Sequence, residues 1–376
     1  MDKENKHKIL NRLAYFTFVI LIVFIGLEVL LRIYNPFHFY LKYNQIVLPV
    51  NQKQLIHNNL NPKIDKEIIN TRNALGFRGP EKPDSLENYL SIITVGGSTT
   101  ECHFLSDNKT WPYLLGENLK KSFSNVWVNN AGFDGHSTFG HNILLNDYLK
   151  RLHPRFITFL VGVNEVENDA PTFHDKLNIK GAYPDFKHYL FANSEVLNLG
   201  LNFLRGWRAQ KFNNTTNNAL DLVNYRKIDL PVALMNKRLE NQKIYLQNFE
   251  DRLLHIVDTC KKYNIYPVLI TQPNLMGSGK DSVTGADLER FEIDDSTNGK
   301  LLWEILSCYN QITKNVAEKE GVAYIDLANF LPKNSLYFYD VSHYTNIGAQ
   351  KVAEIISREL GKIINSKYPQ FSLEKG

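Results

Sequence analysis

The sequence predicts an α/β protein built on a five-stranded, mostly parallel sheet with helices on both faces, a three-layer α/β/α sandwich. From residue 91 onward, short apolar runs alternate with longer stretches that have helical periodicity. The apolar runs are hydrophobic throughout rather than at every second position, which is typical of parallel strands buried on both faces. A separate run of 19 residues near the N-terminus, residues 13–31, predicts a transmembrane helix ahead of this domain.

The overall composition is that of a globular protein. Of the 376 residues, 43% are hydrophobic, and the formal net charge is +4. Because this charge is small and no dense basic tract occurs, the sequence does not suggest nucleic-acid binding. The three cysteines, Cys102, Cys260 and Cys308, have no recognised metal or redox spacing and allow at most one disulfide.

Residues 13–31 carry a single charge, that of Glu28. A helix of this length rises about 28 Å, close to the roughly 30 Å of a bilayer core. The run is longer than the apolar region of a signal peptide, which has about 7–15 residues, and no small-x-small cleavage site follows it. We therefore predict an uncleaved membrane anchor, with a cleaved signal or a buried core helix as the alternatives.

Basic residues flank the N-terminal side of this run more heavily than its other side. Residues 1–12 contain Lys3, Lys6, Lys8 and Arg12, whereas only Arg32 and Lys42 follow the run closely. By the positive-inside rule, we expect residues 1–12 in the cytoplasm and the domain after the anchor outside the cell membrane. Glu28 precedes Arg32 by four residues, so the two side chains can pair and reach the interface.

Residues 32–90 are polar and irregular, with prolines at positions 36, 49, 62, 80 and 83. We interpret them as a stalk followed by an entry segment. The main domain is expected to span residues 91–366, with a C-terminal tail at 367–376.

Strands and helices alternate within this domain. Strands are predicted at residues 92–95, 126–128, 156–161, 266–271 and 322–325. Helices are predicted at residues 111–122, 139–152, 236–264, 301–320 and 347–363. Thr110 is the expected N-cap of the first of these helices, and Pro112 lies in its first turn.

Residues 170–235 interrupt the alternation with more than 60 residues rich in Asn and aromatic side chains. Ordinary connections have only a few residues. Because this insertion leaves from the strand edge at which a site is expected, it predicts a small cap over the pocket. A surface insertion with no catalytic role is an equally good interpretation.

Ligands of parallel sheets bind at the carboxyl ends of the strands, so the residues just after each strand indicate the site. Gly96-Gly97-Ser98 follows the first strand, Asn130-Ala131-Gly132 the second, and Gly162-Val163-Asn164 the third. Asp340-Val341-Ser342-His343 precedes the last helix. Each block is weak evidence when it is taken alone.

Together these blocks supply the groups that acyl transfer requires. A serine becomes a strong nucleophile only when a base accepts its proton, and a third group must orient that base. Ser98 is the candidate nucleophile, His343 the base and Asp340 the orienting carboxylate. Donors for the oxyanion would be the N–H groups of Ser98 and Gly132 and the side-chain amide of Asn164.

The order and content of these blocks resemble those of the SGNH/GDSL hydrolase family. VGGSTT around Ser98, NNAG at Gly132, GVNE at Asn164 and DVSH at Asp340 and His343 match its four blocks, over residues 91–363. The GGST form of the serine block resembles a membrane-anchored bacterial branch. The resemblance implies the flavodoxin-like SGNH hydrolase fold and ester chemistry at these residues.

Two positions depart from the family pattern. Gly97 stands where the family name has Asp, a residue that is not one of the catalytic groups. Glu165 replaces the Asp that usually follows Asn164, and we expect it to support the loop by hydrogen bonding. The α/β-hydrolase alternative fits poorly, because its Gly-x-Ser-x-Gly motif needs glycine where Thr100 stands.

His136 and His141, with Asp134 nearby, raise the question of a metal. Their spacing is not a recognised ligand set, so we expect them to line the pocket or the surface. The mechanism needs no metal or other cofactor.

The resemblance and the anchor imply a membrane-anchored, outward-facing serine esterase. Its substrate would be an O-acyl ester, expected to be O-acetyl, on a cell-surface or exported glycan, or else an acylated small molecule. Two alternatives stay open: an O-acyltransferase that uses the same triad, and a non-catalytic glycan-binding or scaffold component of an export complex.

Overall fold

The computed structural model describes residues 3–34, 41–42, 45–46, 48, 50–59, 61–172, 174–175, 190, 193–201, 203 and 220–373. The chain divides into two compact units. One comprises Met1–Val47 and Asn178–Thr215, and the other comprises Leu48–Leu177 and Thr216–Gly376.

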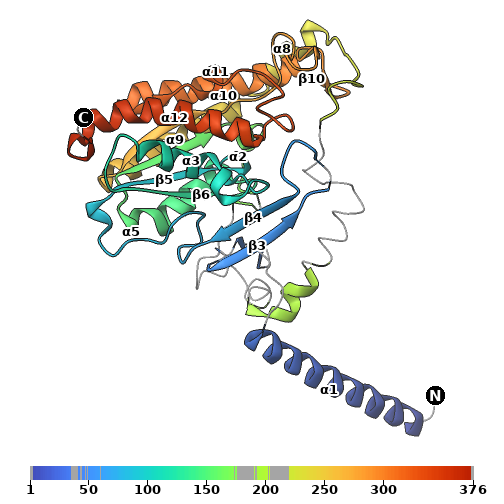
Figure 1. Cartoon of the computed structure of the whole chain (residues 1–376). Helices are drawn as coiled ribbons and strands as arrows, with labels where there is room; N and C mark the ends of the chain where they lie inside the picture. The colour runs from blue at the N-terminus through green and yellow to red at the C-terminus, as the bar shows by residue number, and fades with distance from the viewer. Residues whose placement is uncertain are drawn as a thin grey trace. The chain divides into compact units, whose positions relative to one another are not determined.

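The larger unit is built on a five-stranded parallel sheet (Figure 1). The strands lie in the order β11 (Ala323–Ile325), β8 (Tyr266–Thr271), β7 (Phe156–Val161), β5 (Leu90–Gly96) and β6 (Val126–Gly132), and every neighbouring pair is parallel. The predicted fold is confirmed, and this strand order is that of flavodoxin-like sandwiches. Gly96 is in register with both Gly132 and Leu160, so the ends of β5, β6 and β7 meet at one edge.

Helices cover both faces of this sheet (Figure 1). On one face, α3 (Trp111–Leu119) packs against α12 (Asn346–Lys367). On the other face, α9 (Lys243–Lys262) packs against α10 (Gly299–Glu320) and α4 (Thr138–Leu144). The sheet is therefore buried on both sides, as its continuous apolar strands require.

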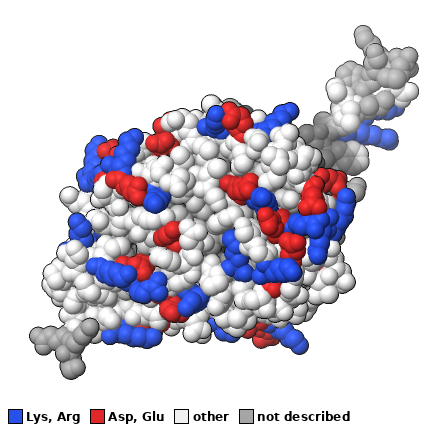
Figure 2. All heavy atoms as spheres, turned by 90° about the horizontal axis from the view of Figure 1, so that it is seen from above, with Lys and Arg blue, Asp and Glu red and all other residues white. Residues whose placement is uncertain are grey.

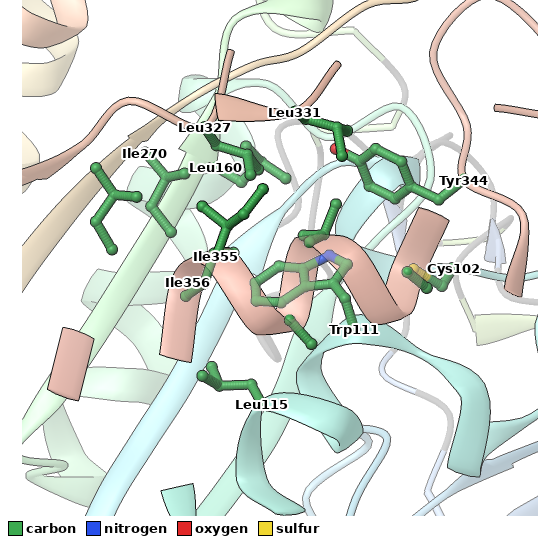
Figure 3. Packing of buried hydrophobic residues seen from close by; sticks show 14 of the residues in the cluster. Cys102, Trp111, Leu115, Leu160, Ile270, Leu327, Leu331, Tyr344, Ile355 and Ile356 are labelled. Carbon is green, nitrogen blue, oxygen red and sulfur yellow. The ribbon is translucent and has the colours of Figure 1, made fainter. Parts of the chain in front are cut away.

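Trp111 connects the core to the first strand–helix turn. Its side chain is fully buried among residues of α3, α12 and the sheet (Figure 3). The indole Nε1 donates a hydrogen bond of 3.0 Å to the carbonyl oxygen of Thr99 in α2 (Ser98–Glu101). The Thr110 hydroxyl accepts a bond from the Tyr113 N–H, as expected of the N-cap of α3. The indole hydrogen bond holds α2 on the core, and the Thr110 cap fixes the start of α3, which carries Trp111.

Two predicted helices differ from those observed. The helix expected at residues 139–152 contains a π-helical turn, Leu145–Leu149, between α4 and α5 (Lys150–Leu152). The helix expected at residues 236–264 is divided into α8 (Val232–Glu240) and α9. The apolar periodicity continues across both interruptions, so the sequence did not indicate them.

Much of the segment predicted to be a stalk belongs to the larger unit. Its strands β3 (Gln52–His57) and β4 (Glu67–Arg72) pair as an antiparallel hairpin. Side chains of β4 alternate between exposed and covered, which is the pattern of a strand with one face on the protein. Beyond the hairpin, Arg78 forms an antiparallel bridge with Asn130 on the edge strand β6. This hairpin and the residues after it therefore pack on the sheet domain.

The surface of the described residues carries charges of both signs. Figure 2 shows Lys and Arg interspersed with Asp and Glu over the face that it presents. On this face the positive and negative side chains are mixed and do not form separate patches of one sign. All three cysteines are free, and Cys102 and Cys260 are buried.

The smaller unit contains α1 (Lys3–Ile33), the short antiparallel pair β1 (Leu41–Lys42) and β2 (Gln45–Ile46), and a helical segment at residues 195–201. By length and composition, residues Leu10–Ile33 of α1 are able to cross a membrane, and an 18-residue window within them has a mean hydropathy of 2.5. Residues 173, 176–189, 191–192, 202 and 204–219 lie outside the described part of the chain. The predicted cap at 170–235 therefore falls largely outside it.

Candidate active site

Ser98 stands at the turn between β5 and α2. β5 ends at Gly96, Gly97 is the N-cap, and Ser98 is the first residue of α2. A Cβ on Gly97 would lie 2.3 Å from Nδ2 of Asn164, so only glycine allows the amide to approach the turn. The glycine before the serine is therefore explained by the neighbouring loop that carries Asn164.

The structure brings Ser98, His343 and Asp340 together. Ser98 Oγ lies 2.8 Å from His343 Nε2, and His343 Nδ1 lies 2.7 Å from Asp340 Oδ2. These residues are 245 and 3 positions apart in the chain, so the first contact depends on the tertiary fold. Both side chains of the histidine–aspartate pair retain some exposure, 21% for His343 and 18% for Asp340.

Asp340 positions His343 through both carboxylate oxygens, one on the backbone and one on the ring. Its Oδ1 accepts the backbone N–H groups of Ser342 and His343, at 2.9 and 2.7 Å. Its Oδ2 faces His343 Nδ1, and an ionised carboxylate can only accept there. The proton therefore sits on Nδ1, which leaves Nε2 as an acceptor for the Ser98 hydroxyl.

Electrostatics around the pair favour its charged form. Burial opposes ionisation of both groups, but their mutual hydrogen bond and attraction outweigh it. The pKa of His343 is consequently raised and the pKa of Asp340 is lowered. The negative charges of Asp134 and Glu101 also act to raise the pKa of His343. An imidazolium formed by proton transfer from Ser98 would therefore be stabilised at this position.

The ring of Tyr339 supports the imidazole from one side. The two rings are stacked, with centroids 5.6 Å apart and an angle of 10° between their planes. Tyr339 is itself buried, at 4% exposure, and its N–H donates to the His343 carbonyl oxygen at 3.0 Å. The turn that carries His343 is thus held by packing as well as by Asp340.

Asn164 places an amide beside the turn that carries Ser98. It lies in the 3₁₀ turn Val163–Glu165 that follows β7. Its Nδ2 donates 2.9 Å to the carbonyl oxygen of His136, which leaves a second N–H on the same nitrogen. The approach of Nδ2 to Gly97 shows that this amide lies next to the residue that precedes Ser98.

Gly132 differs from the expectation. Its N–H donates 2.9 Å to Oδ1 of Asn130 and is therefore engaged in this structure rather than offered to a ligand. Its lack of a side chain has another cause: a Cβ would lie 2.4 Å from the backbone nitrogen of Glu101. Glycine at this position allows the end of β6 to pack against the backbone of α2.

Gly135, which sequence reasoning missed, offers a different N–H from the same loop. Within the described residues this N–H donates to no partner. Gly135 has a φ of +67°, and a Cβ would lie 2.4 Å from Cγ of His174, so glycine is required on both counts. The charge of the preceding residue, Asp134, acts to raise the pKa of His343. The carbonyl oxygen of the following residue, His136, accepts the amide of Asn164. In the sequence FDGHS, residues 133–137, a second glycine follows soon after the strand, and this glycine was the signal that could have identified Gly135.

Glu165 supports the loop that carries Asn164, as expected. Its carboxylate accepts the N–H and the hydroxyl of Thr138 at 2.6 and 2.8 Å, and Nη2 of Arg252 at 3.0 Å. The side chain is 1% exposed, and this burial raises the pKa of Glu165 although Arg252 opposes the shift. The loop after β7 is thereby connected to α4 and α9.

Asp175 connects the start of the long insertion to the same region. It is fully buried, and its Oδ1 accepts the N–H and hydroxyl of Ser137 and the N–H of Gly140. Its Oδ2 accepts two bonds from Thr172. Burial would raise the pKa of Asp175, but these hydrogen bonds lower it. The carboxylate fixes the N-terminus of α4, next to the Gly135 loop.

His136 and His141 are buried rather than placed on a pocket surface. Each is 1% exposed, and burial lowers the pKa of His136 to about 4 and that of His141 to about 3. Both imidazoles are therefore neutral near pH 7. Within the described residues, no group of three or more potential metal ligands is present.

The fold and these contacts define a class of protein. A serine at the carboxyl edge of a parallel sheet, bonded to a histidine that an aspartate orients, is the arrangement of serine hydrolases. The chain belongs to the GDSL-like Lipase/Acylhydrolase family, whose model matches residues 93–351. It is therefore an ester-hydrolysing enzyme of that family.

Solved structures of similar fold have low sequence identity to this chain. An acetylxylan esterase from Geobacillus stearothermophilus is 13% identical with a TM-score of 0.42, and the alignment covers 72% of this chain and 93% of the esterase. An alpha/beta hydrolase enzyme from the metagenome of Lake Arreo, Spain, is 13% identical with a TM-score of 0.42, with coverages of 73% and 96%. A comparison with curated protein sequences gave no match.

Proposed function

We propose that this protein is a membrane-anchored serine esterase that removes an O-acyl group, in particular O-acetyl, from a glycan outside the cell membrane. The observation that carries the ester chemistry is the chain of contacts from Ser98 through His343 to Asp340, at 2.8 and 2.7 Å. The anchor and its basic N-terminal flank support the extracellular location.

The first half of the reaction forms an acyl-enzyme. Ser98 Oγ attacks the ester carbonyl carbon while its proton moves to Nε2 of His343. The negative charge of Asp340 stabilises the imidazolium that results. The tetrahedral intermediate then collapses, the bond from carbon to the alcohol oxygen breaks, and His343 returns the proton to the leaving alcohol.

The second half releases the acid. Water attacks the acyl carbon and gives a proton to His343 Nε2, and collapse of the second tetrahedral intermediate breaks the bond to Ser98 Oγ. His343 then returns the proton to Ser98. The products are one carboxylic acid and the regenerated serine, so atoms and charges balance.

The oxyanion of each intermediate requires donors that are already in place. We assign the N–H of Ser98 and the free N–H of Asn164 Nδ2 to this role. Gly135 takes the third place in preference to Gly132, because the Gly132 N–H is bonded to Asn130. Ser98 begins α2, so its N–H points out of the helix and is available.

Ester turnover by the Ser98→Ala variant tests this proposal. Wild type and variant are assayed on p-nitrophenyl acetate and on acetylated glycans, with release of acetate as the readout. We expect a loss of at least about 10³-fold in kcat for the variant. Wild-type turnover by Ser98→Ala would contradict the mechanism. Transfer of the acyl group to an offered glycan, without free acetate, would instead identify an O-acyltransferase.

A further inference from the structure

Glu28 makes contacts that its place in an apolar helix does not predict. It is the one acidic residue in the stretch Leu10–Ile33, which by length and composition is able to cross a membrane. A charge inside a bilayer is costly unless it is paired or reaches the interface. Glu28 lies five residues before the end of this stretch, or roughly 8 Å along the helix. It therefore stands close to the outer boundary of the hydrocarbon.

The carboxylate of Glu28 accepts hydrogen bonds from the start of a second helix in the same compact unit. Its Oε2 accepts the hydroxyl of Ser194 at 2.9 Å and the N–H of Val196 at 3.2 Å, and its Oε1 accepts the N–H of Glu195 at 3.1 Å. Arg32 completes the set with Nε at 2.9 Å from Oε1. The first amide groups of a helix have no partner within it, so a carboxylate satisfies them well.

The segment that begins at Ser194 is organised as a capped helix. The Ser194 hydroxyl accepts the N–H of Leu197 at 3.2 Å, as an N-cap does, and residues 195–201 are helical. Arg32 also donates to the carbonyl oxygen of Asn193, one residue before this cap. These contacts join the turn of α1 from Glu28 to Arg32 to the N-terminus of the helix that begins after Ser194.

The composition of this second helix is amphipathic. At 100° per residue, Val196, Leu197, Leu199, Leu201 and Phe203 fall within an arc of about 200°, and Glu195 and Asn198 lie outside it. Phe203 is 56% exposed, and Leu190, just before the segment, is 41% exposed. An apolar face of this kind is unfavourable in water but suits the boundary between headgroups and acyl chains.

We propose that residues 193–201, with Phe203, form a second membrane contact, an interfacial helix that lies at the outer end of α1 and is attached to it by the Glu28 carboxylate. The proposal rests on the membrane anchor of the proposed function. The occupant of the apolar face is the bilayer that holds α1, because the helix begins at a residue near the outer boundary of the candidate span. Glu28 then acts as a structural acceptor rather than as an exposed charge in lipid.

Spin labelling of the full chain in liposomes tests this proposal. Cys308 is replaced by serine, while the buried Cys102 and Cys260 are retained. One nitroxide is attached at Phe203→Cys, and in a separate protein at Glu195→Cys on the polar side of the same helix. Collision with oxygen, which concentrates in lipid, is compared with collision with a water-soluble nickel chelate.

We expect the label at 203 to favour oxygen and the label at 195 to favour the nickel chelate. Adding Glu28→Gln to the labelled proteins should abolish the difference between the two positions, whereas Glu28→Asp, which keeps a carboxylate, should preserve much of it. Equal nickel accessibility at both positions with Glu28 intact would overturn the proposal, and so would a difference that Glu28→Gln leaves unchanged.

Flotation of the liposomes separates this result from the fate of the anchor. Protein that does not float with the lipid would show that the anchor itself fails; the interfacial helix and the membrane location would then fall together, and the ester chemistry at Ser98 would be unaffected. Protein that floats with label 203 exposed to the nickel chelate would leave the anchor standing and remove only the interfacial helix. Retained activity on p-nitrophenyl acetate confirms that each variant is folded.

Discussion

At the residue scale, the Asp340 carboxylate does two things to His343. It fixes the proton on Nδ1 through a contact of 2.7 Å, and its negative charge raises the pKa of the imidazole. The base is competent only when it is neutral. Activity is therefore expected to rise with pH as His343 loses its proton, around a pKa above the usual 6.5 of histidine.

Replacing Asp340 with Asn is predicted to change both features. Loss of the negative charge lowers the pKa of His343, so the midpoint of the rise in kcat/KM moves to lower pH. Loss of the acceptor disturbs the tautomer, and kcat should fall by about 10²–10⁴-fold. Profiles of kcat/KM from about pH 5 to about pH 9 measure both effects. An unchanged midpoint in the variant would contradict this role of Asp340.

A second prediction at this scale concerns Asn164. Replacing it with Ala removes an amide donor beside the turn that carries Ser98, and we expect kcat to fall by about 10²–10³-fold with little change in KM. The matched control is Asn168→Ala, whose amide donates to the carbonyl oxygen of Asn164 rather than into the site. A larger loss in the control would show that loop support, and not the amide, matters.

At the element scale, two buried arginines hold the segment that follows Ser98. Arg72, at the end of β4, forms an ion pair with Glu101 at the end of α2, and both side chains are almost fully buried. Arg78 donates to the carbonyl oxygens of Glu101, Cys102 and Leu105 at 2.7–2.8 Å. The hairpin in the segment that was predicted to be a stalk therefore helps to fix the position of α2, which begins at Ser98.

Removing Arg72 should be strongly destabilising. In Arg72→Met the buried Glu101 carboxylate loses its opposite charge, and we expect a loss of about 3–5 kcal/mol in unfolding free energy. Arg226→Met is the control, because that arginine is 69% exposed and pairs with Glu292 at 2.9 Å, so the expected loss is below about 1 kcal/mol. Urea unfolding measures both. Similar losses of unfolding free energy in the two variants would contradict the stronger contribution of the buried ion pair.

The same pair predicts a pH dependence of stability. Burial would raise the pKa of Glu101, but the charge of Arg72 and the nearby His103 lower it to about 2, from the usual 4.5 of glutamate. Ionised Glu101 therefore stabilises the fold above pH 4.5, and this contribution is lost as the pH falls toward about 2. Glu101→Gln should be less stable at neutral pH but lose less on acidification. Urea unfolding midpoints of wild type and variant at neutral and at acidic pH test this prediction. Equal losses of stability on acidification in the two proteins would refute it.

At the scale of the whole molecule, the sequence predicted the sheet well because strand runs and ligand blocks are local signals. Ser98 and Asn164 follow the ends of strands, so the rule for parallel sheets located them. Asp340 and His343 lie before α12 and were located by their Asp-x-x-His block. The choice between Gly132 and Gly135 depends on a contact with Asn130 and so required the fold. The hairpin escaped notice because it is short and mostly polar, although the alternation in EIINTR was a usable signal.

Whole-molecule organisation also predicts how the protein fractionates. The full chain should be recovered with membranes, and deletion of residues 1–33 should release it into the soluble fraction, because the apolar stretch Leu10–Ile33 is removed. External protease added to intact cells should digest the larger unit if it faces outward. Protection from the protease would contradict the orientation but not the anchor.

The mechanism depends on the contact between Ser98 and His343, and labelling with a fluorophosphonate measures whether His343 activates the serine. Mass spectrometry of the folded protein should find the adduct on Ser98 in the wild type. Labelling should be lost in Ser98→Ala and slowed by at least about 10²-fold in His343→Ala. It should be unchanged in His255→Ala, since that histidine is exposed on α9. Labelling of Ser98 at the wild-type rate in His343→Ala would contradict the account.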